Sequence, residues 1–573
     1  MSSQFYRFIL IVGLCPMALV ACGDDSSGSA ADGGSGDGSD GGGSGDGDGD
    51  GDGDGSGDGD GDGDGDGDGD GDGDGAGSAE ASRLGWYQQI GITDVSDDVP
   101  GSILIDDDGA VTLVGANTAQ AFTFGGGTDA DVTTQNGSYV ARYDGDGNLV
   151  WWNAFANRGA AASALALGSN GDMYVGGSFD KDSTAFAVND QPNMNTRSPS
   201  GSDNGKRDAY LVKLTAAGPD QRPVVAWAQT FGGQFPDTVT SAAIDESGGS
   251  PQLIICGYIE GRHTMMGIDV DANAEDVAAM FVAAIDADGN ALWVNHGLAI
   301  MPGGRDEYSQ CNDLTLDGAG NIYIVGSAQG TGRFVQTAAT VGSPIAVDAA
   351  GTDYDLGSGD AFAAKYGSDG SLIWVEVFGG DDDDRAQAVD YDADNGRIAL
   401  TGTIGHGATV GAIDLVGTHG QNNKFGGAFV ASLSTDDGSV QWAQDIATDG
   451  PKSAYDIAAD GDGNLFVTGV TGETFPFAGA TVEASAGDYY LVSYDADGAE
   501  RWSQQVVRTG ADINGAWSSG NALNVSPNGS EIAWAFLCAP NTDGQLLFGD
   551  ELIDMTWDGR GLETLVTTLD ASQ

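Results

Sequence analysis

Carboxylates are the most abundant reactive side chains in this 573-residue sequence, which has 87 Asp and Glu residues against 21 Lys and Arg. Four aspartates stand at corresponding places in a repeated pattern: Asp98, Asp237, Asp306 and Asp384. If the fold brings them together, their carboxylates repel one another, and a bound cation would relieve that repulsion. Ca²⁺ is the hard, oxygen-seeking candidate. We therefore predict a Ca²⁺ site at these four residues, with a solvated acidic rim as the alternative.

Other patterns that could do chemistry are less specific. Residues 144–148 and 286–290 begin like a calcium loop, but neither has the later bidentate Glu or flanking helices, so we predict tight turns there. The histidines show no metal-ligand spacing, and we expect them in loops or at the surface. These are His263, His296, His406 and His419. No Gly-x-Ser-x-Gly elbow, phosphate-binding loop or Cys-x-x-Cys motif is present, so we predict no catalytic residue.

The elements that must position the four aspartates belong to an internal repeat built around tryptophan. A first strand, such as residues 280–285, leads through a Gly turn to a second strand that carries the tryptophan, such as Trp293. An alanine-rich third strand, such as 241–245, and a fourth, such as 320–326, complete the unit. Period-two alternation bounded by Gly and Asp turns is typical of antiparallel strands.

The two ends of the chain complete one repeat. The sequence enters the repeat at Trp86, on a second-type strand, and the missing first-type strand is supplied by residues 562–570. Such closure removes an open sheet edge. We predict an all-β, seven-bladed β-propeller of four-stranded antiparallel blades, closed by N- and C-terminal strands that share one blade. The equivalent tryptophans favour packing between blades over a carbohydrate platform.

Strand parity predicts where the four aspartates lie. In a meander, the connections after the tryptophan strand share a face with the long connections 178–207, 330–358 and 403–426, and the tight turns form the opposite face. The alanine content of the third strand suggests that it lines the axis. The aspartates would then ring the mouth of the channel.

The repeat resembles the bacterial seven-bladed β-propeller repeat of exported surface proteins. The resemblance rests on residues 359–365 with Trp374, on Phe378-Gly-Gly-Asp-Asp-Asp-Asp384, and on Asp317-Gly-Ala-Gly-Asn-Ile-Tyr-Ile-Val-Gly326. It covers about residues 85–573 and is weaker around Trp86 and Trp502. It implies the propeller fold and export, and it implies no common activity.

The first 22 residues resemble the export signal of a bacterial lipoprotein. An apolar run from Phe8 ends in Leu19-Val-Ala-Cys22, which is similar to a lipobox. The resemblance implies a signal peptide over residues 1–21 and acylation of Cys22, palmitate included. Because Gly23 follows, it also implies an outer-membrane lipoprotein exposed at the cell surface, with a periplasm-facing domain as the alternative. An ordinary signal peptide with a chance cysteine is the competing interpretation.

Composition separates a tether from the propeller domain. Residues 22–80 are almost entirely Gly, Asp and Ser and cannot bury apolar surface, so we expect a disordered tether before a propeller domain at 81–573. The formal net charge of −66 disfavours nucleic acid as a partner. The expected partners are the membrane, through the lipid anchor, and a protein or glycan ligand on the long-loop face.

The sequence does not determine whether the remaining cysteines pair. Cys256, Cys311 and Cys538 lie in the domain, and one pair, Cys256–Cys311, could bridge in an oxidising compartment. Three small buried thiols are the alternative.

The sequence favours a membrane-anchored surface lipoprotein that presents its propeller as a binding module. Two alternatives remain: a propeller-based extracellular enzyme (a lyase, glycosidase or quinone-dependent dehydrogenase), or an envelope-assembly scaffold. Since one fold hosts many functions, the propeller alone does not choose between them.

Overall fold

The computed structural model describes most of the chain after residue 82. The described residues are 83–91, 99–117, 121–124, 132–133, 137–157, 160–180, 207–216, 218, 221–232, 236–260, 262–271, 278–299, 309–329, 332–337, 345–347, 359–380, 382–405, 407–415, 427–446, 452–472, 474–482, 488–508, 521–538, 545–548, 551–554 and 563–571. This part of the chain contains strands and turns, and no helix in it has the length and hydropathy that a membrane crossing needs.

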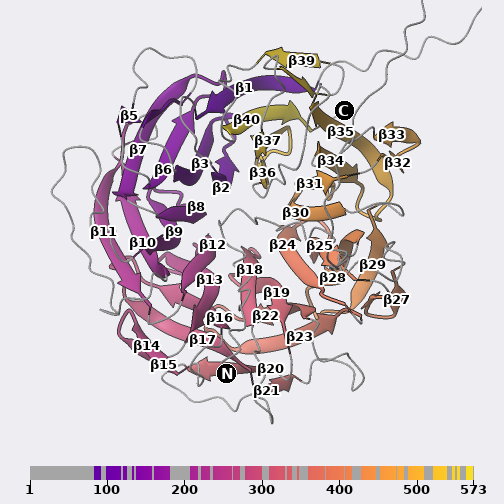
Figure 1. Ribbon diagram of the computed structural model, residues 1–573. Helices are drawn as coiled ribbons and strands as arrows, with labels where there is room; N and C mark the ends of the chain where they lie inside the picture. Colours follow the sequence, from indigo (N-terminus) through magenta and orange to yellow (C-terminus); the bar gives the residue numbers. More distant parts are fainter. Residues whose placement is uncertain are drawn as a thin grey trace, which may run out of the picture. The chain divides into compact units, whose positions relative to one another are not determined.

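Seven antiparallel four-stranded blades make up the domain (Figure 1). We name each blade after its inner strand. The inner strands are β2 (Val99–Ile105), β8 (Ala161–Leu167), β12 (Thr238–Asp245), β18 (Ser309–Leu316), β24 (Arg385–Asp392), β30 (Lys452–Ala459) and β36 (Asn521–Val525). Each pairs with the strand that follows it in the chain: β3 (Val111–Asn117), β9 (Met173–Asp180), β13 (Gln252–Glu260), β19 (Ile322–Ala328), β25 (Arg397–Ile404), β31 (Leu465–Thr471) and β37 (Glu531–Cys538).

The third and outermost positions complete the blades. The third strands are β6 (Gly137–Tyr143), β10 (Arg207–Thr215), β16 (Ala278–Ile285), β22 (Asp360–Tyr366), β28 (Gly427–Ser434), β34 (Asp488–Tyr494) and β40 (Glu563–Asp570). The outermost are β7 (Leu149–Asn157), β11 (Val224–Phe231), β17 (Ala291–Ala299), β23 (Leu372–Phe378), β29 (Val440–Asp445), β35 (Glu500–Arg508) and β1 (Leu84–Ile90).

The inner strands close into a ring around the axis. Each contacts the inner strand of the next blade, and β36 returns to contact β2 (Figure 1). Small residues such as Ala164, Ser241 and Ala388 recur on these strands, because seven strands converge where space is least. The last blade joins both ends of the chain, since β1 pairs antiparallel with β40. Both the seven-bladed prediction and the closure prediction are confirmed.

Tryptophan packs between neighbouring blades. The Trp442 ring on β29 lies against the tight turn of the next blade, where a Cβ on Gly498 would stand 2.9 Å from the ring. Gly498 has φ +83°, so the turn itself favours glycine. Trp442 Nε1 also donates to the Ala496 carbonyl at 3.2 Å. Equivalent Trp–Gly contacts join Trp86 to Gly147, Trp227 to Gly289, Trp293 to Gly370, and Trp374 to Gly438. The predicted packing between blades is confirmed for these five tryptophans.

The tight turns form as expected. In the 144–148 turn, Asp144 Oδ1 accepts the backbone N–H of Asp146 at 3.1 Å and of Asn148 at 2.8 Å, and Gly147 has φ +79°. The 286–290 turn repeats this geometry. The aspartate oxygens therefore organise the turn.

The connections hold short strands that the sequence did not predict. Among the described residues, four two-stranded hairpins occur: β4–β5 (Ala121–Phe122, Val132–Thr133), β14–β15 (Arg262–Met265, Ile268–Asp271), β26–β27 (Thr409–Val410, Ile413–Asp414) and β32–β33 (Phe475–Phe477, Ala480–Val482). Two sheets grow outward to six strands by β20–β21 (Gly332–Thr337, Ile345–Val347) and β38–β39 (Gln545–Phe548, Glu551–Asp554).

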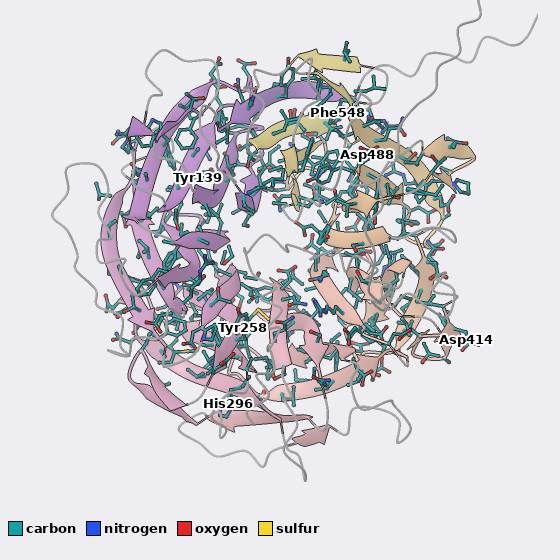
Figure 2. The ribbon with its side chains drawn as sticks, viewed as in Figure 1. Tyr139, Tyr258, His296, Asp414, Asp488 and Phe548 are labelled. Atoms are coloured by element: carbon teal, nitrogen blue, oxygen red, sulfur yellow. A yellow bond between two sulfur atoms is a disulfide. The ribbon has the colours of Figure 1, made fainter. Side chains whose placement is uncertain are left out.

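One of these extensions corrects an expectation about histidine. His296 is neither in a loop nor at the surface but within β17, with 2% of its area exposed (Figure 2). The reason is that β20 pairs with β17 and covers an edge that would otherwise meet solvent. His263 lies in β14, and His406 and His419 fall outside the described ranges.

Candidate functional site

Two of the four aspartates predicted to bind Ca²⁺ can be located. Asp237 and Asp384 each directly precede an inner strand and are fully buried. Asp384 Oδ2 accepts the backbone N–H of Gly380 and its Oδ1 that of Gly405, both at 2.7 Å. Asp237 Oδ1 accepts the N–H of Glu260 at 2.9 Å. Asp237 therefore binds the end of β13 in its own blade, whereas Asp384 binds both the loop that leaves β23 of the preceding blade and the end of β25 in its own.

Each located aspartate also faces a second buried aspartate across a glycine. A Cβ on Gly379 would lie 2.6 Å from Asp384 Oδ2 and 2.8 Å from Asp360 Oδ1, so both carboxyls crowd this one position. Asp208 and Asp237 meet at Gly232 in the same way. Burial raises the pKa of Asp360 to about 6, and the pKa values of Asp384 and Asp208 to about 7. These pairs hold the loop after the tryptophan strand against the blade.

The Ca²⁺ site stays a prediction. Asp98 and Asp306 fall in ranges that the structure does not describe, as does Cys22. Within the described ranges, no three His, Cys, Asp or Glu side chains stand close enough together to hold a metal ion.

A polar cavity of about 150 Å³ lies where the seven inner strands converge. All seven strands contribute to its wall: Gly101 to Ile103, Ser163 to Leu165, Thr240 to Ala242, Asn312 and Asp313, Gln387 and Ala388, Tyr455 and Asp456, and Asn521 with Leu523. Most inner strands carry a β-bulge here, for example at Asn312 and Tyr455. A bulge places two consecutive residues opposite one partner and redirects their side chains. The bulges therefore supply polar side chains to a narrow axis.

Two aspartates border this cavity and a third lies beside them. Asp313 on β18 accepts the N–H of Val389 at 2.9 Å, and Asp456 on β30 accepts that of Leu523 at 2.7 Å. Asp390 on β24 accepts the N–H of Ala459 at 2.9 Å. In all three cases the donor belongs to the next blade, so these carboxylates bind the inner ring together.

The three carboxyls resist ionisation. Burial is the main cause that raises the pKa of each, to about 6 for Asp390, above the usual range for Asp313 and well above it for Asp456. Repulsion among them adds to the effect for Asp390 and Asp456. Strongly shifted carboxyls in a cavity are a common property of functional sites.

The sequence did not predict this axial group. Its signal is an aspartate within an inner strand where the other blades carry Ala, Ser or Thr, as in Asn312-Asp-Leu-Thr315 and Ala454-Tyr-Asp-Ile457. Recognising it requires the bulge, because the bulge decides which residue of the strand reaches the axis.

A disulfide joins two blades near this cavity. Cys256 on β13 bonds to Cys311 on β18 with a Cα–Cα distance of 5.9 Å, and the yellow S–S bond is visible in Figure 2. The structure therefore decides a pairing that the sequence left open. Thr240 Oγ1 donates to the Cys311 carbonyl at 2.9 Å, so a hydrogen bond supports the same boundary.

Comparison with known proteins adds little beyond the fold. No family model matches the chain. Regulatory protein FlaEY of Caulobacter vibrioides is 24% identical over 443 residues, which is 72% of this chain and 41% of that protein. The chain thus spans about two fifths of the length of that relative.

Solved structures resemble the chain only distantly. Chaetomium thermophilum Sqt1, solved with the N-terminus of ribosomal protein L10, has 10% identity and a TM-score of 0.37, covering 83% of this chain and 97% of that one. A quinohemoprotein alcohol dehydrogenase from Pseudomonas putida has 12% identity and a TM-score of 0.35, covering 85% and 76%. These likenesses do not indicate an activity.

Proposed function

We propose that this chain is a membrane-anchored lipoprotein that presents its propeller as a binding module at the bacterial cell surface. The observation that carries the binding role is the axial cavity, because all seven blades place polar groups around it. Concave sites with a few convergent polar groups are where proteins bind small ligands. The fold supplies the rigid scaffold that such a site needs.

Two observations support export and anchoring. Leu19-Val-Ala-Cys22 is similar to a lipobox, and a Gly/Asp tether follows it. The Cys256–Cys311 disulfide suits an oxidising compartment, since disulfides persist mainly in exported proteins. A lipid on Cys22 would hold the domain at the membrane, and the tether would extend it outward.

The anchor is tested by replacing Cys22. We expect Cys22→Ser to move the protein from the membrane fraction to the soluble fraction and to abolish labelling by a clickable palmitate analogue. Cys15→Ser is the matched control, because Cys15 lies in the same export segment but not at the lipobox position. Wild-type protein without acyl label, or Cys22→Ser protein that stays in the membrane, would refute the anchor.

The surface location has a separate test. Brief protease treatment of intact cells should degrade the propeller if it faces outward, while a periplasmic marker protein stays intact. A propeller protected until the outer membrane is permeabilised would place the domain in the periplasm.

A further inference from the structure

The axial cavity has an acidic wall without an opposing cation. Asp313 and Asp456 both line it, on inner strands separated by one blade. None of the residues that line the cavity is Lys, Arg or His. A half-buried carboxylate without a positive partner is costly, and the protein meets that cost in part with the backbone N–H groups of Val389 and Leu523. A positively charged ligand would offset the rest of this energetic cost.

The wall also contains amide atoms that lack hydrogen-bond partners. Asn312 Nδ2 donates to the Ala386 carbonyl at 2.7 Å, which fixes the amide, and Asn312 Oδ1 is then buried with no donor among the described residues. Asn521 Oδ1 accepts from Trp534 Nε1 at 3.3 Å, while Asn521 Nδ2 is buried with no acceptor in the same part of the chain. Buried polar atoms are usually paired, so the amides of two residues that line the cavity have unused hydrogen-bonding capacity.

The geometry favours a ligand with N–H donors over a metal ion. A Ca²⁺ ion needs six to eight oxygens at about 2.4 Å. The described residues offer no cluster of three acidic, His or Cys ligands, and both carboxylates that border the cavity already accept backbone N–H groups. A guanidinium or ammonium group instead donates along several directions to acceptors that are farther apart.

The size of the cavity limits the ligand. A protein cavity of about 150 Å³ can hold a molecule the size of benzene, or roughly five waters at about 30 Å³ each. The volume here is also about 150 Å³. Methylguanidine or a short alkylamine fits within this volume.

We propose that the axial cavity binds a small organic cation, a guanidinium or alkylammonium compound, through the carboxylates of Asp313 and Asp456. Neutral polar groups of the wall, Asn312 and Ser241 among them, accept or donate the remaining hydrogen bonds. This ligand class rests on the proposed binding function and specifies it.

Calorimetric titration of the full-length protein in detergent tests the ligand class. The probes are methylguanidine and methylurea, which have nearly the same shape but differ in charge. We expect one methylguanidine per chain, bound at least about tenfold more tightly than methylurea, because hydrogen bonds between charged groups exceed neutral ones by that order. Equal affinities, or no binding of methylguanidine, would overturn the proposal. So would saturation with Ca²⁺ that excludes methylguanidine.

Variants locate the binding. Asp456→Asn should weaken methylguanidine binding about tenfold or more, and Asp313→Asn should do the same. Asp384→Asn is the matched control, because Asp384 also accepts backbone N–H groups but does not line the cavity. The affinity of this variant for methylguanidine should stay within about twofold of the wild-type value. Unchanged binding in a folded Asp456→Asn protein would place the ligand elsewhere. If a variant fails to fold, as circular dichroism would show, the comparison of methylguanidine with methylurea on the wild type still tests whether the site prefers a cation.

The proposed ligand class and the proposed lipid anchor can be refuted independently. A protein that is held in the membrane through Cys22 but does not bind methylguanidine would remove the ligand class alone. A protein that binds methylguanidine but carries no lipid would remove the anchor alone.

Discussion

Asp456 and Leu523 join two blades: the carboxylate on β30 accepts the backbone N–H on β36 at 2.7 Å. Asp313 and Asp390 make the same kind of contact with the blades that follow theirs. Between β36 and β2 an amide takes over, since Asn524 Oδ1 accepts the N–H of Ile105 at 3.1 Å. The inner ring is therefore held by side chains that bridge neighbouring blades, in addition to apolar packing.

Asn524 provides a precedent that predicts the effect of substituting Asp390. Asp390→Asn should lower the free energy of unfolding by less than about 1 kcal/mol, because an amide oxygen can still accept the Ala459 N–H. Asp390→Ala should lower it by about 2 kcal/mol, since that half-buried donor would lose its partner. Urea denaturation measures both. Equal losses for Asn and Ala would show that the hydrogen bond contributes nothing.

The Asp360–Asp384 pair predicts a dependence of stability on pH. Burial raises the pKa of these carboxyls to about 6 and about 7, from ordinary values of 3.8. A carboxyl whose pKa is higher in the folded chain stabilises the fold below about pH 4, and this contribution is lost as the pH rises to about 7. Asp360→Asn removes one titrating group and gives Asp384 a donor. Its unfolding free energy, relative to wild type, should therefore rise between pH 4.5 and 7.5 by about 1.4 kcal/mol per unit of pKa shift removed.

The exposed turn residue Asp369 is the control for this measurement. Hydrogen bonds from Ser371 lower the pKa of Asp369, so its contribution to stability changes only below about pH 4, and Asp369→Asn should differ from wild type by a constant amount between pH 4.5 and 7.5. A difference between Asp360→Asn and wild type that stays flat across the pH range would contradict the shared burial of Asp360 and Asp384.

The Trp442–Gly498 contact predicts a large effect of one methyl group. Gly498→Ala would place a Cβ 2.9 Å from the Trp442 ring at φ +83°, and we expect a loss of about 3 kcal/mol from strain and overlap together. Gly171→Ala is the matched control, with φ +82° and no atom within 4 Å of the added Cβ, and should cost only about 1 kcal/mol. Thermal melts of the two variants compare them. Similar melting temperatures would mean that the Trp442 ring moves aside at little energetic cost.

The Cys256–Cys311 disulfide predicts a stability difference under reducing conditions. It closes a loop with a sequence separation of 55, for which the chain-entropy account gives about 4 kcal/mol. Replacing both cysteines by alanine should lower the unfolding free energy by up to that amount and make it insensitive to dithiothreitol. A double variant as stable as the wild type would assign the stability of this boundary to packing and hydrogen bonds alone.

Residues with local signatures made the fold predictable from the sequence. Trp293, the glycines of the tight turns and the strand at 562–570 each act within one repeat or at its closure, so their spacing reveals the blade. The axial aspartates have no such signature. Asp313 and Asp390 reach their partners through a bulge and a neighbouring blade, and strand alternation alone does not reveal either.

For the predicted metal ligands, the sequence indicates the position in the chain but not the direction of the side chain. The alignment of the repeat placed Asp237 and Asp384 before their inner strands, but it could not show that Gly232 and Gly379 leave room for a second aspartate beside each. Because each carboxylate then accepts nearby backbone N–H groups, position in the chain did not determine which way the oxygens point.

The most direct test of the binding function is a crystal structure of the protein with methylguanidine at a concentration that saturates the calorimetric site. We expect planar difference density in the axial cavity, with nitrogen atoms about 2.8 Å from carboxylate oxygens of Asp313 and Asp456. Only water in that cavity, with methylguanidine elsewhere or absent, would contradict the axial binding site.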